Sequence, residues 1–167
     1  SGPGDERPLT ELGRQQSQRM ADLLMADGPI DALFSSPALR CRETLQPLAV
    51  KLGLPIEVLP GFRDTQGFRA PRGWENPERA GPDPFGGAYC AGSAFAALQT
   101  IRARPGLRRA VLCSYGDIVP AFLAFLAGAY ATELPPRSNA RGYLYRVAFD
   151  GGRITLSARP APADFPA

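Results

Sequence analysis

Apolar residues recur with helical spacing in the first third of the chain. A partial apolar stripe over 11–26, preceded by Thr10 as a good N-cap, predicts an amphipathic helix. A second helix is expected over about 38–52, with Gly53 as its C-terminal cap. Pro47 falls inside this second helix and should kink or divide it, because proline lacks the backbone N–H that a helix uses.

Short apolar runs bounded by turn residues predict strands between and beyond these helices. The turn residues Asp150-Gly151-Gly152 should join the last two runs as a β-hairpin. Two further helices are expected over 88–102 and 118–127. Strands and helices that alternate in this way indicate an α/β sandwich with a mostly parallel central sheet. The expected strands cover 30–34, 56–59, 110–113, 143–149 and 153–158.

Glycine and proline are dense over residues 60–87, which argues against a long helix or strand there and predicts a long irregular loop. A loop of this length is typically a lid over a functional site or simply a mobile segment. The chain shows no internal repeat and no domain linker. Residues 1–167 are therefore expected to form a single domain, which is long enough for a full-sized core.

Composition narrows the classes of function. The net charge is only +3, with no dense run of lysine and arginine, so no nucleic-acid partner is expected. Three widely spread cysteines do not indicate a disulfide framework, and without histidine no metal site is expected. The longest apolar stretch, Ile118 to Tyr130, is too short to span a membrane. With no signal-like start, a cytoplasmic protein without a membrane partner is the expectation.

Three motifs follow one another in a characteristic order. They are Leu-Thr-x-x-Gly within 7–14, Ser-Ser-Pro-x-Leu-Arg over 35–40, and Ser-x-Gly-Asp within 113–120. With this order and spacing the chain resembles the histidine phosphatase (phosphoglycerate-mutase-like) superfamily, closest to its phosphohistidine-phosphatase-like branch. The resemblance implies a three-layer α/β sandwich and no cofactor. It also implies phosphoryl transfer to a histidine, with an acidic proton donor and with two arginines and a second histidine holding the phosphate.

The firmest match to this phosphate site is Arg40. It would lie in the first turns of a helix at the carboxyl edge of the sheet, where an arginine can bind two phosphate oxygens; the alternative is a surface arginine on an exposed helix. Tyr115 stands where the resemblance places the second histidine, and it either contacts phosphate or closes the pocket without touching a ligand. Ser114 and Gly116 flank it, and Gly116 would let the backbone approach a bound anion.

The resemblance also points to Asp64, after Phe62-Arg63, as a possible general acid; the alternative is an ordinary loop-capping residue. Arg7 and Arg14 would line the pocket mouth or simply lie exposed at a helix start. Arg42 and Glu43 are expected to face solvent, where they could form a local ion pair.

The nucleophile has no candidate, since the chain contains no histidine. Neither Cys41 nor Cys113 begins the Cys-x5-Arg pattern of tyrosine phosphatases, and no glycine-rich phosphate loop with lysine is present. Family members begin with a central strand that ends in Arg-His, and Ser1 falls just after its expected place. Either the protein is longer than this chain, another polypeptide or a second copy donates the strand, or the fold is remodelled. The first explanation is favoured.

Three functions remain open. The first is a domain that keeps a phosphate pocket around Arg40 and binds a phosphorylated small molecule or phosphoprotein without turnover. The second is an active phosphomonoester or phosphohistidine phosphatase whose Arg-His strand lies upstream of Ser1. The third is the C-terminal structural module of a larger Nudix-type protein that processes nucleotides.

Overall fold

Three parallel strands form the main sheet of the computed structural model, which describes residues 4–64, 68, 84–138 and 140–165. The sheet has the strand order β2-β1-β3. A β-hairpin of two longer antiparallel strands, β4 and β5, forms a second sheet. The strands are β1 (Ala32–Ser35), β2 (Ile56–Val58), β3 (Ala110–Cys113), β4 (Leu144–Asp150) and β5 (Arg153–Arg159).

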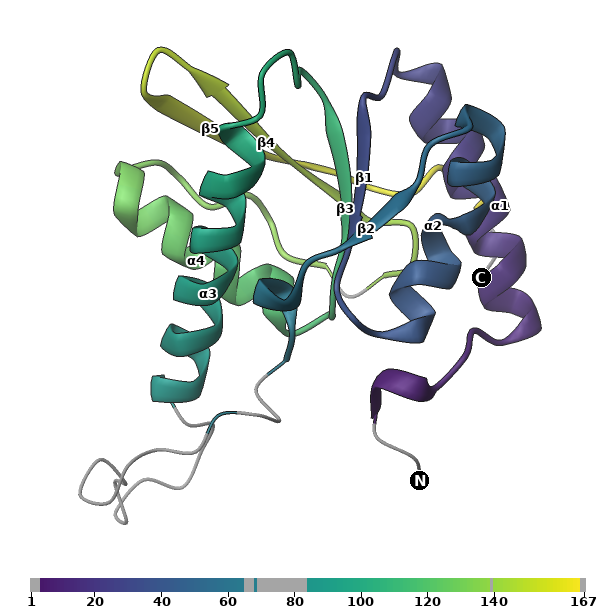
Figure 1. The fold of residues 1–167 in the computed structure, drawn as a ribbon, viewed down its shortest axis with the longest axis horizontal. Helices are drawn as coiled ribbons and strands as arrows, with labels where there is room; N and C mark the ends of the chain where they lie inside the picture. Colours follow the sequence, from purple (N-terminus) through teal and green to yellow (C-terminus); the bar gives the residue numbers. More distant parts are fainter. Residues whose placement is uncertain (1–3, 65–67, 69–83, 139, 166–167) are drawn as a thin grey trace.

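Four helices cover the two faces of the parallel sheet. Figure 1 shows α1 and α2 on one side of the strands and α3 and α4 on the other, so the molecule has three layers. This arrangement confirms the α/β sandwich that the sequence predicts. The helices are α1 (Glu11–Ala26), α2 (Leu39–Leu52), α3 (Pro84–Arg102) and α4 (Ile118–Tyr130), and two short 3-10 helices are η1 (Gly4–Glu6) and η2 (Pro60–Phe62).

Two apolar clusters hold the layers together, one on each face of β1. Leu33 packs with Leu24 and Leu48 of the α1–α2 layer. Phe34, the next residue, packs with Phe122 of the α3–α4 layer. Neighbouring residues of a strand point to opposite faces, so the apolar run of β1 supplies both clusters. A strand buried on both faces is typical of a parallel sheet between two helical layers.

Local signals at the helix ends act as the sequence predicts. The Thr10 hydroxyl accepts a hydrogen bond from the Gly13 amide at 3.1 Å, which caps α1. Gly53 ends α2 in the left-handed conformation with a φ of 66°. Pro47 does not divide α2, which runs continuously from Leu39 to Leu52.

The expected element boundaries are one residue off at several strand ends, in β2, β4 and β5, and differ by more in three places. The first strand covers Ala32–Ser35 rather than 30–34. Helix α4 continues to Tyr130 rather than stopping at 127. Helix α3 begins at Pro84, so the irregular segment ends four residues earlier than the glycines at 86 and 87 indicated. Proline is favourable in the first turn of a helix, where its missing N–H costs nothing.

Most of the long Gly/Pro-rich segment, 65–67 and 69–83, lies outside the described residues, and so does the expectation of a lid there. Its beginning forms η2, which packs tightly on α3. A Cβ atom at Gly61 would stand 2.8 Å from the Ser93 carbonyl oxygen, so only glycine fits this approach.

The closing hairpin forms as predicted, with φ angles of 49° at Gly151 and 89° at Gly152 in its two-residue turn. Within the described ranges no ladder pairs β3 with either hairpin strand, so β3 forms one edge of the parallel sheet. None of the helices in this part of the chain is long and apolar enough to cross a membrane.

A carboxylate at the start of β1 joins it to the start of β3. The Asp31 Oδ2 atom accepts hydrogen bonds from the backbone amides of Arg109 at 2.8 Å and Arg108 at 2.9 Å. These bonds lower the pKa of Asp31 below its ordinary value of 3.8. A depressed carboxyl pKa contributes stability that is present above the unfolded-state value and is lost as the pH falls through the folded-state value.

We therefore expect Asp31→Ala to lower the free energy of unfolding at pH 7 and to change it much less at an acidic pH below the folded-state pKa of Asp31, where the native carboxyl is itself protonated. Urea unfolding of both proteins at the two pH values measures this difference. Glu133→Ala, at an exposed site, is the control for general charge removal. An equal loss of stability at both pH values would contradict the prediction.

Candidate functional site

The predicted phosphate-binding residues converge at the carboxyl edge of the parallel sheet. Strands β1 and β3 run side by side with Ser35 opposite Cys113, and the Ser36 amide donates to the Cys113 carbonyl at 2.9 Å. The chain therefore leaves both strands at the same edge. There it enters α2 after one strand and α4 after the other. In open parallel sheets this edge is where ligands bind.

Arg40 lies in the first turn of α2, as predicted. Its guanidinium carbon is 4.8 Å from the centroid of the Tyr115 ring, so the two principal candidates are in contact through a cation–π interaction. Arg42, two residues further along the helix, is exposed as expected. Glu43 differs from the expectation, because it is half-buried and its carboxylate accepts a hydrogen bond from the Leu9 amide at 2.6 Å.

Tyr115 is only 3% exposed, and its hydroxyl donates a hydrogen bond to the carboxylate of Asp5. Burial, followed by the hydrogen bond to Asp5, raises the pKa of the Tyr115 phenol above its ordinary value. The phenol is therefore neutral at pH 7. It supplies a hydrogen-bond donor to the site, but neither a positive charge nor a nucleophilic phenolate.

Asp5 is a site residue that sequence reasoning missed. It comes from η1, and besides Tyr115 it lies 3.9 Å from the Nε atom of Arg63. Its negative charge also raises the pKa of the Cys41 thiol, whereas the positive charge of Arg40 lowers it. Asp5 thus places a carboxylate next to the residues that are predicted to bind phosphate. No local motif marks it, since its partner Tyr115 is 110 residues away along the chain.

Asp64 and Ser114 join the site from the side of η2. The Ser114 hydroxyl donates to the Phe62 carbonyl at 3.0 Å, which ties the end of β3 to the segment that carries Asp64. The half-buried Asp64 carboxylate is near enough to raise the pKa of both Tyr115 and Cys90. The structure thereby brings the possible general acid to the predicted phosphate-binding residues.

Gly116 is exposed, and a Cβ atom built on it would meet no other atom within 4 Å. The space in front of this glycine is therefore open to a ligand. At the start of α4 the Asp117 carboxylate accepts a hydrogen bond from the Ile118 amide at 3.0 Å. This cap occupies the Ile118 amide at the start of α4.

All three cysteines are free, and they gather beside the same site. Cys41 of α2 and Cys90 of α3 are buried in a cluster with Tyr115, and Cys113 at the end of β3 packs against it. Interaction with the Cys113 thiol lowers the pKa of Cys41 to about 7, and interaction with the Cys41 thiol, followed by burial, raises the pKa of Cys113. Their spacing in the sequence gave no sign of this cluster.

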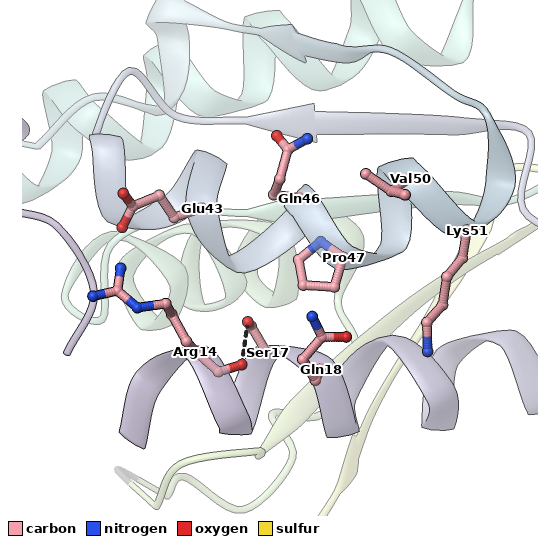
Figure 2. Close-up of a pocket in the computed structure, with 8 residues that line it drawn as sticks. All are labelled: Arg14, Ser17, Gln18, Glu43, Gln46, Pro47, Val50 and Lys51. Carbon is pink, nitrogen blue, oxygen red and sulfur yellow. Dashed lines mark hydrogen bonds between the residues drawn. The ribbon is translucent and has the colours of Figure 1, made fainter. Parts of the chain in front are cut away.

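A separate groove lies between α1 and α2, with a cavity volume of about 390 Å³. Figure 2 shows its mixed polar and aliphatic lining, which includes Arg14. The Nε atom of Arg14 also lies 3.3 Å from the carboxylate of Glu11, with which it forms an ion pair. Arg14 therefore lines this groove rather than the mouth of the predicted pocket. The groove contains none of the residues Arg40, Asp64 or Tyr115, and the described part of the chain has no cluster of three or more potential metal ligands.

Comparison with known proteins agrees with the fold. Residues 2–79 match the family model of the histidine phosphatase superfamily (branch 1). Over these residues the chain is similar to the histidine phosphatase superfamily. Its fold is phosphoglycerate-mutase-like, since it superposes on a mycobacterial glucosyl-3-phosphoglycerate phosphatase, Rv2419c, in complex with VO3. That match has a TM-score of 0.71 at 20% identity, over 96% of this chain and 90% of the other.

The chain is also similar to two further proteins. The protein histidine phosphatase SixA, in complex with tungstate, superposes with a TM-score of 0.60 at 24% identity over 93% of this chain and 85% of the other. The 8-oxo-(d)GTP phosphatase of Mycolicibacterium smegmatis is 24% identical over 98% of this chain and 44% of its own length. The chain spans only 10% to 44% of the length of the curated relatives it matches.

Proposed function

We propose that these 167 residues form a phosphate-binding domain of the histidine phosphatase superfamily that does not itself turn over phosphate esters. The observation that carries the proposal is the contact of Arg40 with Tyr115 at the carboxyl edge of the sheet, in a chain without histidine. The guanidinium supplies charge and a fork of donors for an oxyanion. The ligand is a phosphorylated small molecule or a phosphoprotein.

The oxyanions named with the two solved neighbours, VO3 and tungstate, support an anion site in this fold. None of the described residues at the candidate site is suited to act as the nucleophile of phosphoryl transfer. Tyr115 stays protonated, and Cys41, the thiol with the lowered pKa, lacks the arginine six residues later that a Cys-x5-Arg phosphatase uses to hold the phosphate. Asp64 would still be positioned as a proton donor for a leaving group, but it has no phosphoryl acceptor to work with in this chain.

We expect no hydrolysis of p-nitrophenyl phosphate above the buffer rate and a rise in melting temperature with millimolar phosphate. The rise follows from mass action, because a ligand that binds only the folded state stabilises it by RT ln(1 + [L]/Kd). Sodium chloride at matched ionic strength is the control. Hydrolysis that disappears in Arg40→Ala would overturn the inactive assignment, and an unchanged melting temperature would overturn the pocket.

A second candidate is an active phosphomonoester or phosphohistidine phosphatase in which an additional strand supplies Arg-His. Among the described residues β3 forms an edge of the sheet, and this edge could accept such a strand from a longer polypeptide, a partner or a second copy of the chain. A synthetic Arg-His strand peptide added to the chain should then generate activity. A peptide with alanine in place of its histidine should not, and light scattering tests for self-association.

A third candidate, a structural module of a larger Nudix-type protein, draws support from the match to the 8-oxo-(d)GTP phosphatase along nearly the whole chain. Nucleoside diphosphates and triphosphates would then raise the melting temperature more than inorganic phosphate at equal concentration. Equal rises in melting temperature with nucleotides and with inorganic phosphate would show that the nucleotide base does not contribute to binding, which would contradict this candidate.

A further inference from the structure

Two of the clustered thiols are arranged as a pair. Cys41 lies in the first turn of α2 and Cys113 ends β3, and both pack in one apolar cluster, where the thiol of Cys113 is near enough to lower the pKa of Cys41. Adjacent pairing of β1 and β3 fixes this contact, because the turn from Ser36 into α2 starts opposite Cys113. Two thiols held together by different elements are preorganised to form a bond.

We propose that Cys41 and Cys113 form a reversible disulfide on exposure to a peroxide, and that this bond regulates the adjacent site. Both thiols are free, and the bond would hold their sulfur atoms about 2.0 Å apart. The modification site lies one residue from Arg40 in α2 and two residues from Tyr115 after β3.

The chemistry balances with hydrogen peroxide as the oxidant. The Cys41 thiolate attacks one peroxide oxygen, the O–O bond breaks, and hydroxide leaves to give a sulfenic acid at Cys41. The Cys113 sulfur then attacks the Cys41 sulfur, the S–O bond breaks, and water leaves with the Cys113 proton. Both sulfur atoms are oxidised, and one peroxide is reduced to two waters. A thiol reductant reverses the reaction through a mixed disulfide.

The roles of the two sulfurs follow from their surroundings. Interaction with the Cys113 thiol and the charge of Arg40 favour the thiolate of Cys41, so Cys41 is the attacking sulfur. Cys113 is half-buried at the strand end, where it can resolve the sulfenic acid. Cys90 lies in the same cluster, but burial and the charge of Asp64 raise its pKa, so it stays a thiol.

The Cys41–Cys113 disulfide would link α2 to β3, the two elements next to the residues proposed to bind phosphate. This consequence rests on the proposed function. Drawing α2 toward β3 shifts Arg40 relative to Tyr115, because each neighbours one of the two cysteines. We expect the oxidised protein to bind phosphate about fivefold more weakly or worse, within the usual range of coupling between sites. Formation of the bond itself does not depend on phosphate binding.

The experiment treats the reduced protein with hydrogen peroxide and identifies the linked residues by peptide mass spectrometry. We expect a Cys41–Cys113 peptide that lacks two hydrogen atoms and disappears with dithiothreitol. Cys41→Ser and Cys113→Ser should abolish it, whereas Cys90→Ser, the matched control, should retain it. Differential alkylation of the wild-type protein gives the same answer without a variant, since Cys41 and Cys113 should become protected together while Cys90 remains a thiol.

A linked peptide containing Cys90, or oxidation that stops at isolated sulfinic acids, would overturn the inference. A disulfide that forms while phosphate never binds would contradict the proposed function and leave the thiol pair standing. Phosphate binding without any disulfide would contradict the thiol pair and leave the proposed function standing. The two failures are therefore distinguishable.

Discussion

Arg40→Ala should weaken phosphate binding by on the order of 100-fold and remove the rise in melting temperature that millimolar phosphate produces. The guanidinium is the cation predicted to bind the phosphate, and charge-assisted hydrogen bonds of this kind are worth about 3 kcal/mol. A loss of about 3 kcal/mol corresponds to roughly two orders of magnitude in Kd. Isothermal titration calorimetry with inorganic phosphate measures the constant directly.

Arg42→Ala is the matched control, because it removes the same side chain from an exposed position in the same helix. It should change Kd by less than about threefold, the effect of one screened surface charge. Arg40→Ala also removes the contact with the Tyr115 ring, so the unliganded proteins are compared first and only the phosphate-dependent shift is interpreted.

Arg40→Lys separates charge from geometry. It keeps the positive charge but loses the planar fork, so its Kd should fall between those of the wild type and Arg40→Ala. Equal losses in Arg40→Ala and Arg42→Ala would show that phosphate responds to net charge alone, and the assignment of Arg40 to the site would be wrong.

The sequence predicted those parts of the fold that local chemistry decides. Thr10 caps α1 and Gly53 ends α2 because their side-chain and backbone properties act within one helical turn. The closing hairpin follows from adjacent glycines that take positive φ angles. The start of α3 at Pro84 escaped prediction, since glycine and proline there indicate a loop unless packing stabilises the helix.

Only those residues of the candidate site that stand in a sequence motif could be predicted. Arg40 and Tyr115 stand in motifs at two strand ends, and parallel pairing of β1 with β3 brings those ends together. The contact of Asp5 with Tyr115 joins residues 110 positions apart, and no motif contains either the acid or the thiol pair. Such contacts depend on the register of the sheet and on helix docking, which periodicity alone does not fix.

Asp5→Asn should bind phosphate roughly tenfold more tightly than the wild type. The Asp5 carboxylate contacts Tyr115 and lies near Arg63, so a phosphate held beside Tyr115 must either displace this carboxylate or approach a like charge. Two like charges a few ångströms apart repel by several kcal/mol at an effective dielectric constant near 20, and solvent around the half-exposed carboxylate reduces this figure. The amide keeps the shape and the acceptor for the Tyr115 hydroxyl while removing the charge.

Glu6→Gln is the matched control, because Glu6 is the next residue of η1, is exposed, and carries the same charge. If Asp5 occupies the anion position, Asp5→Asn tightens binding and Glu6→Gln leaves it nearly unchanged. Equal gains in both variants would mean that only the overall charge matters. No gain in Asp5→Asn, in a protein where Arg40→Ala still abolishes binding, would place the phosphate on the far side of Arg40 from Asp5. The carboxylate would then be a structural partner of Tyr115 rather than an internal competitor of the ligand.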